Sequence, residues 1–227
     1  MDRRHTDREY ESELEALRER VLLMGARVEE MMTLALRAFT QKDVSLAENT
    51  IRADRQIDQL ELSIDELCLR ILARRQPVAS DLRFVTTTLK LVTDLERIAD
   101  LCVNICERVV EIAPELPFSS TDSITRIADV AQGMVHDALD AFVARDAIKA
   151  EQVMQRDDIV DAYYAQLFPE LVARMMSDPG LVFRSTRLLS LGKYVERIAD
   201  HATNIAEMVV FMVRGEDVRH MSPPSEE

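Results

Sequence analysis

The sequence predicts an all-α protein made of two tandem three-helix bundles. Leu, Ala, Glu, Arg and Met dominate the composition, with no Trp and only five glycines, which is typical of helices rather than strands. Apolar residues recur at helical spacing along most of the chain. The phrase ERIADLCVNICE at 96–107 returns as ERIADHATNIAE at 196–207. This repetition indicates an internal duplication of one helical unit.

The first repeat is expected to span residues 1–112 and to contain three helices. The breaks in the apolar pattern place these helices at about 11–40, 44–74 and 81–112. Pro77 stops the second helix, because proline lacks the amide hydrogen that a continuing helix uses. Ser80 or Asp81 is then expected to accept an amide hydrogen bond as the N-cap of the third helix.

A Pro- and Ser-rich stretch, APELPFSSTD at 113–122, is interpreted as the linker between the repeats. The second repeat is expected to span 123–215, with helices at about 123–144, 147–176 and 181–214. Gly215 is a suitable residue to end the last helix, and 216–227 is expected to be a flexible tail. Because short loops make neighbouring helices antiparallel, each repeat is expected to run up, down and up.

The two halves match beyond the repeated phrase. Asp54 and Asp58 align with Asp157 and Asp161 at an offset of 103 residues, whereas the repeated phrase has an offset of 100. A slip of three residues in the loop between the helices accounts for the difference. We therefore expect both halves to have the same three-helix arrangement.

Acidic residues share one face of the predicted helices. With about 100° of rotation per residue, Glu96, Asp100 and Glu107 fall close together on one side of their helix, and Asn104 lies beside them. The preceding helix carries a similar line of acids at Asp54, Asp58, Glu61 and Asp65. Each face is therefore an oxygen-rich stripe on the side of its helix that is opposite the apolar residues.

Two interpretations of these stripes remain open. Most charged stripes on helices are solvated surfaces. However, carboxylates four residues apart repel each other by roughly a few tenths of a kcal/mol per pair, and only Arg97 and Arg197 lie beside the stripe. Carboxylates from two neighbouring helices also form the all-oxygen donor set that Mg²⁺, Mn²⁺, Ca²⁺ or iron accepts. In the second repeat the line is shorter, because Tyr164 and Phe168 continue it.

The chain strongly resembles the PhoU family, accessories of the phosphate-specific transport system, in the repeated phrase, in PVASDLR at 77–83 and in KYVERIADHATNIAEMVVFMVRGE at 193–216. The resemblance extends over nearly the whole chain, from about His5 to Gly215. It implies that paired E(D)xxxD motifs on the bundle surface bind metal in some members, with iron, zinc, manganese or magnesium as candidate ions. Carried over by motif, the implied metal positions are Asp54, Asp58, Glu96, Asp100, Asp157, Asp161, Glu196 and Asp200.

Further residues are candidates for the same faces, namely Asn104, Glu107, Asn204, Glu207 and His201. His201 has no counterpart in the first repeat, where Leu101 stands, and it lies about 100° from Asp200 around the helix. That position favours an ordinary flanking residue over a metal ligand. Cys102 and Cys106 lie opposite the carboxylates and are interpreted as buried thiols.

The loop before the third helix is a candidate contact for partner proteins. Its charged residues are Arg74, Arg75, Asp81 and Arg83. Arginines bind phosphate and carboxylate groups well, although those in loops are most often solvated. The family resemblance implies two partners, the ATPase subunit of the phosphate transporter and a phosphate sensor histidine kinase, and it implies a homodimer. Contact with the membrane would be peripheral and through these proteins.

Composition argues against several classes of protein. A net charge of −13 disfavours nucleic-acid binding. Three cysteines without a CxxC pair and a polar beginning predict a soluble protein of the cytoplasm. The longest apolar run, MVVFMV at 208–213, is much shorter than the about 20 residues that a membrane span needs. An enzyme is not expected, because the sequence has no Gly-rich phosphate loop and no GxSxG, HExxH or Glu-x-x-His motif.

Two functions are predicted as alternatives. In the first, which rests mainly on the resemblance, the protein is a non-enzymatic adaptor that couples the state of the phosphate transporter to the sensor kinase. It then represses phosphate-starvation genes when phosphate is plentiful. In the second, the protein is a helical metal-storage or metal-sensing protein. The absence of a Glu-x-x-His motif argues against ferritin-like chemistry for the second alternative.

Overall fold

The computed structural model describes residues 3–113 and 122–218. Within these ranges every regular element is helical. The elements are α1 (Arg3–Gln41), α2 (Val44–Ala53), α3 (Arg55–Arg75), α4 (Ala79–Ile112), α5 (Asp122–Ala144), α6 (Ala147–Met154), α7 (Asp157–Ser177), the 3₁₀ turn η1 (Pro179–Leu181) and α8 (Val182–Arg214). Most of the expected linker, and the part of the expected tail from 219 onward, lie outside the described residues.

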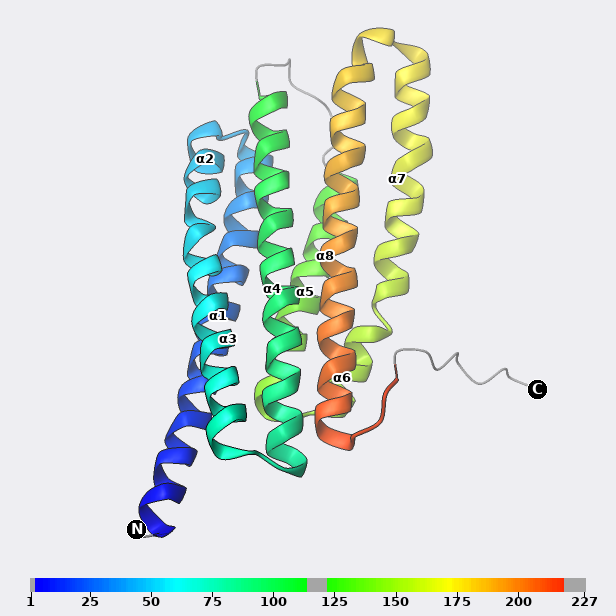
Figure 1. Cartoon of the computed structure of the whole chain (residues 1–227). Coiled ribbons are helices and arrows are strands. Elements are labelled where there is room, and N and C mark those ends of the chain that lie inside the picture. Colours follow the sequence, from blue (N-terminus) through cyan, green and yellow to red (C-terminus); the bar gives the residue numbers. More distant parts are fainter. Residues whose placement is uncertain (1–2, 114–121, 219–227) are drawn as a thin grey trace, which may run out of the picture.

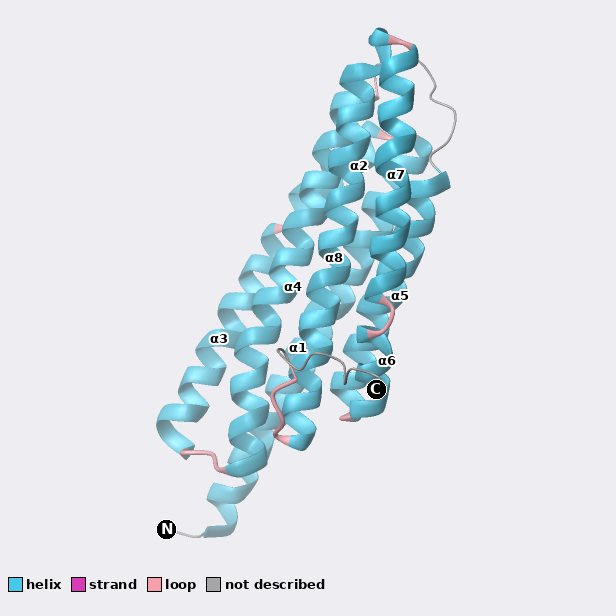
Figure 2. Cartoon of the chain, turned by 90° about the vertical axis from the view of Figure 1, so that its right-hand side faces the viewer, coloured by secondary structure: helices cyan, strands magenta, loops and turns pink. Residues whose placement is uncertain are grey.

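The all-α prediction of two three-helix repeats is confirmed. In the first repeat α1 and α4 flank a middle helix formed by α2 and α3, and in the second repeat α5 and α8 flank α6 and α7. Figure 1 shows α4 and α8 side by side at the centre of the molecule, running in opposite directions. Figure 2 shows the resulting elongated bundle, in which short loops join long helices.

The middle helix of each repeat is broken, which the sequence analysis did not predict. The amide of Ile57 donates to the carbonyl of Asp54 at 2.8 Å, so the helix tightens by one residue at this point. The amides of Arg156 and Ile159 make similar short-range bonds at 3.0 and 3.1 Å. Both breaks therefore fall immediately beside an aspartate of the acidic stripe.

Gly215 ends α8 in a left-handed conformation, as predicted, but the expected cap of α4 is not observed. Val78, in an extended conformation, precedes α4, so Ser80 and Asp81 lie inside its first turn and the predicted side-chain cap is wrong. Asp43 instead accepts from the amide of Leu46 at 2.9 Å and begins α2. Asp146 likewise begins α6, where its side chain accepts from the amides of Ile148 and Lys149 at 2.9 and 3.0 Å. These two caps occupy matching positions in the two repeats.

One continuous hydrophobic core joins the repeats, because α4 packs along α8 and α1 packs along α5. Cys102 and Cys106 lie in this core as free thiols, as predicted. Burial raises the pKa of the Cys106 thiol to about 12. Within the described residues, no helix combines the length and the apolar character required to cross a membrane.

Candidate metal-binding faces

The acidic face of the first repeat forms where the broken middle helix packs against α4. Burial, followed by the charges of Asp58 and Asp100, raises the pKa of Asp54 to about 6. Burial and the charge of Asp100 likewise raise the pKa of Glu96. The structure therefore brings the four predicted carboxylates of this repeat into one electrostatic cluster, in which proximity and partial burial disfavour ionisation.

Two further carboxylates on α3 extend this cluster. Burial, followed by the charges of Asp65 and Asp58, raises the pKa of Glu61. One oxygen of Asp65 is buried and has no hydrogen-bond partner, and burial raises the pKa of this carboxyl. The family motif does not include either residue. Glu61 follows Asp58 by three residues and Asp65 follows Glu61 by four, which places both on the same helical line, and that spacing is the signal that identifies them.

Arg97, which the sequence places beside the acidic stripe, reaches two of its carboxylates. Its guanidinium donates to Asp100 at 2.8 Å, and its Nε lies 3.4 Å from Glu96. The arginine side chain is 54% exposed, so the pairing is screened by water. Arg97 therefore offsets part of the repulsion that the stripe would otherwise suffer.

The second repeat presents a smaller face. Burial, followed by the charges of Asp200 and Asp161, raises the pKa of Asp157 to about 6. Glu196 is only 8% exposed. Its carboxylate lies 2.5 Å from Nζ of Lys193. Asp157, Asp161 and Asp200 therefore come together here as well, whereas Glu196 is paired with the ammonium group of Lys193.

The donors on both faces are chemically suited to a hard cation, because all are carboxylates. The unpartnered buried oxygen of Asp65 is consistent with that chemistry in the first repeat. However, among the residues that the structure describes, no three His, Cys, Asp or Glu side chains are gathered closely enough to hold an ion. A bound cation would have to draw the carboxylates inward and compete with Arg97. Metal binding stays a prediction.

Most of the additional candidates lie away from the two faces. His201 and Asn204 both contact Asp94 of α4, at 2.7 and 3.3 Å, and so bridge the two repeats. The sequence analysis did not identify Asp94, because its partners lie on a helix that is distant in sequence.

The remaining candidates are on α4 and α8. Glu207 lines a groove of about 460 Å³ between α4 and α8, and Glu107 pairs with its neighbour Arg108 at 3.3 Å. Asn104 is half-buried on α4.

Three of the four candidate partner residues make contacts inside the molecule. Arg75 donates to Glu13 at 2.8 Å and to Glu9 at 3.3 Å, and Asp81 accepts from the hydroxyl of Tyr10 at 2.9 Å. Arg83 donates to the carbonyl of Met212 at 3.1 Å, near the end of α8. Arg74 is exposed and lines a shallow cleft between α1 and α3. Partner binding at this loop stays a prediction, with Arg74 the most accessible of its arginines.

The fold and its two acidic faces define a duplicated helical-bundle protein with one carboxylate surface per repeat. The family model described as "PhoU domain" matches residues 21–109 and 124–209, so the chain belongs to this family. The resemblance found in the sequence is thereby confirmed.

The chain is similar to named relatives and to a solved structure over nearly its full length. The chain is 42% identical over 219 residues to a protein of Pseudomonas putida named a phosphate-specific transport system accessory protein PhoU homolog, covering 96% of this chain and 85% of the relative. The PhoU protein of Escherichia coli K12 is 34% identical, with 96% and 90% covered. The crystal structure of PhoU from Pseudomonas aeruginosa has 41% identity and a TM-score of 0.88, covering 91% of this chain and all of that one.

Proposed function

We propose that this protein is a non-enzymatic regulator of phosphate uptake that works as an accessory to a phosphate-specific transporter. The supporting observation is that relatives carrying this role in their names match the chain almost end to end. The surface also fits a regulator that binds proteins, since it combines acidic faces with an arginine-containing loop at one end of the bundle.

In this proposal the protein is an adaptor between two partners at the cytoplasmic side of the membrane. It couples the ATPase subunit of the transporter to a phosphate sensor histidine kinase and represses the phosphate-starvation genes when phosphate is plentiful. It acts as a homodimer. Arg74 is the better probe of the loop, because Arg83 is engaged with the end of α8.

The test is genetic and biochemical. A strain that lacks the gene is expected to express a phosphate-starvation reporter in high phosphate, and the wild-type gene is expected to restore repression. Co-purification is expected to recover the transporter ATPase with the wild type and less of it with Arg74→Glu. Lys90→Glu, at an exposed site on α4, is the control for a change of charge. Normal repression in the deletion strain would refute the regulatory role.

A second candidate function is metal binding on the acidic faces, and the pKa values of about 6 at Asp54 and Asp157 favour it. Both values reflect burial first and repulsion between carboxylates second, and a bound cation would offset both by supplying a fixed positive charge between the middle helix and α4 or α8. Carboxylates on both helices would then move as one unit. This would make the shape of the face depend on metal supply.

Elemental analysis of untagged protein, purified without chelator, tests this candidate. The wild type is compared with a variant in which Glu96, Asp100, Glu196 and Asp200 are all alanine. Near-stoichiometric metal in the wild type and none in the variant is the expected result. Absence of metal from both proteins would leave the faces as surfaces for partners, and the adaptor function would then stand alone.

A further inference from the structure

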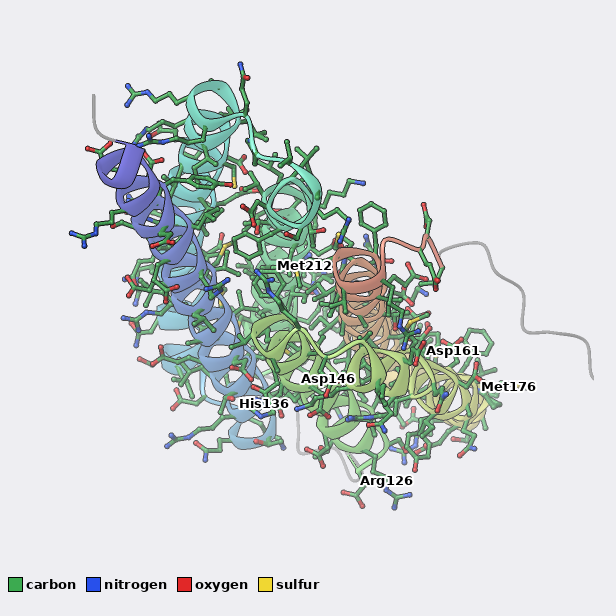
Figure 3. All side chains as sticks on the ribbon, turned by 90° about the horizontal axis from the view of Figure 1, so that it is seen from below. Arg126, His136, Asp146, Asp161, Met176 and Met212 are labelled. Atoms are coloured by element: carbon green, nitrogen blue, oxygen red, sulfur yellow. The ribbon has the colours of Figure 1, made fainter. Side chains whose placement is uncertain are left out.

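A groove runs between α4 and α8 toward the end of the bundle where α4 begins and α8 finishes. Beside Asp94 it has a volume of about 460 Å³. A cavity of about 50 Å³ adjoins it toward the end of α8 and shares Lys90, Glu207 and Met208 with it. About 10–15 Å³ is enough for one water molecule, so the cavity has room for a larger group. Figure 3 shows this end of the bundle from below, with Met212 on the side of α8 that faces the core.

One polar side chain of the cavity is buried without a hydrogen-bond partner. Thr87 lines the cavity and is only 2% exposed, and its hydroxyl has no partner within the described part of the chain. Its neighbours Thr86 and Thr88 both donate to carbonyls four residues earlier, at 2.8 and 2.9 Å. Buried polar groups in folded proteins nearly always have a partner. A ligand that donates a hydrogen bond to Thr87 would therefore be well placed in this cavity.

The internal duplication shows what fills the corresponding position at the other end of the same seam. The repeated phrases align α4 with α8 at an offset of 100 residues. Because α4 and α8 are antiparallel neighbours, each contact at one end of the seam has a counterpart at the other end. Arg187 of α8 forms an ion pair with Glu111 of α4. The counterparts of these two residues are Thr87 and Phe211, and both line the cavity.

Two guanidinium groups fill the seam at that other end. Arg108 lies 3.1 Å from the carboxylate of Glu111, and Arg187 contacts the same carboxylate. The counterparts of both arginines are uncharged, since Met208 corresponds to Arg108 and Thr87 corresponds to Arg187. The open groove therefore lies where the other end of the seam holds arginine side chains of the chain itself.

We propose that this groove binds the guanidinium group of an arginine from a partner protein. A guanidinium is flat and carries five N–H donors and no acceptor, so it suits a site made of acceptors and an aromatic ring. The carboxylates of Glu207 and Asp217 and the hydroxyl of Thr87 are the acceptors. Phe211 supplies the ring. The guanidinium would thus take the place that Arg187 occupies at the other end.

The charge and the position of the groove support an arginine from a protein. Asp94, Glu207 and Asp217 line the groove and its cavity, against the single ammonium group of Lys90. A metal ion is a poorer fit, because no three His, Cys, Asp or Glu side chains of the described residues are gathered around one point. The groove lies about two to three turns along α4 from the loop that carries the candidate partner residues. The choice of a protein as the source of the arginine rests on the proposed function, in which this end of the bundle contacts partners.

The test uses N-acetyl-arginine amide, because its blocked main chain resembles an arginine within a protein. Backbone amide shifts in nuclear magnetic resonance spectra of the full chain, with chelator present, report its binding. We expect saturable shifts at 86–90 and 207–211, with a dissociation constant on the order of 1 mM. The corresponding citrulline compound has nearly the same shape and no charge, and it is expected to bind at least about ten times more weakly. Equal binding of the two compounds would overturn the assignment of a guanidinium.

The duplication supplies matched variants. Glu207→Gln removes a carboxylate of the groove and is expected to weaken binding by about fivefold or more. Glu107→Gln, the same change at the other end of the seam, is the control and is expected to leave binding unchanged. Thr87→Arg copies Arg187 into the groove and is expected to abolish binding. Equal weakening in the two glutamine variants would indicate general attraction to an acidic protein and would overturn the site, as would wild-type binding by Thr87→Arg.

Two further measurements identify the source of the arginine. Free L-arginine has a main-chain carboxylate that Glu207 and Asp217 repel, so it is expected to bind more weakly than the blocked compound. Tighter binding of free arginine would overturn the assignment to a protein. Arg219→Ala is expected to leave binding unchanged, and a gain of several fold would show that the chain's own arginine competes for the groove, which would overturn it as well. Because these measurements use the purified protein alone, their failure leaves the phosphate-starvation reporter result unaffected.

Discussion

Replacing Asp54 by asparagine is expected to stabilise the protein at neutral pH and to leave its stability unchanged in acid. The pKa of Asp54 is raised from 3.8 to about 6 in the folded state, so folding disfavours its ionised form. The contribution of this group to stability is fully present below about pH 4 and is lost as the pH rises through about 6. Asparagine has nearly the same shape and cannot ionise. The variant therefore keeps the stability that the wild type loses.

The magnitude follows from the size of the pKa change. A rise from 3.8 to about 6 corresponds to about 3 kcal/mol when a group is fully shielded. Asp54 is only partly buried, so water weakens both the effect of burial and the repulsion from Asp58 and Asp100, and we expect a gain of about 1–2 kcal/mol. For a protein of this size such a gain raises the melting temperature by about 3–6 °C.

The assay is urea unfolding of wild type and Asp54→Asn, with chelator present, from about pH 4 to about pH 8. The difference between them is expected to grow up to about pH 6.5 and to be constant above it. Glu66→Gln, an exposed change on α3, is the control and is expected to show no such growth. A gain that is the same at all pH values, or a variant less stable than the wild type at pH 8, would refute the reasoning. Added metal ions that bind the face are expected to reduce the difference.

Three further predictions concern contacts that the structure reveals. Lys193→Ala leaves the buried carboxylate of Glu196 without its ammonium partner and is expected to lower the free energy of unfolding by about 1–2 kcal/mol. Urea titrations at pH 8 measure this loss, and Lys193→Arg is expected to restore the wild-type value. Native protein is expected to resist iodoacetamide at Cys102 and Cys106, because burial raises the pKa of both thiols, and rapid labelling by mass spectrometry would contradict their burial. Arg83→Ala is expected to speed amide hydrogen exchange in the last turn of α8 without changing the rest of the pattern, and unchanged exchange there would show that its bond to the chain is dispensable.

The sequence by itself determined the helical class, the duplication and the two acidic lines. Each of these depends on residues that are near in sequence, because helical periodicity and the spacing of a repeated phrase are local properties. The alignment of Asp54 with Asp157 needed no coordinates. For the same reason Glu61 and Asp65 were visible as members of the stripe, although the family motif omits them.

Only the tertiary structure decided which charges meet between distant helices. His201 faces Asp94, and Arg83 reaches the end of α8, because the two repeats pack along α4 and α8. The structure also decided where side chains point. The sequence placed Arg97 beside the acidic stripe but left open whether its guanidinium would reach a carboxylate, as it does at Asp100. Burial of α7 was undetermined as well. An apolar helix in a sequence predicts a covered surface, but the placement of every other helix decides which side is left exposed.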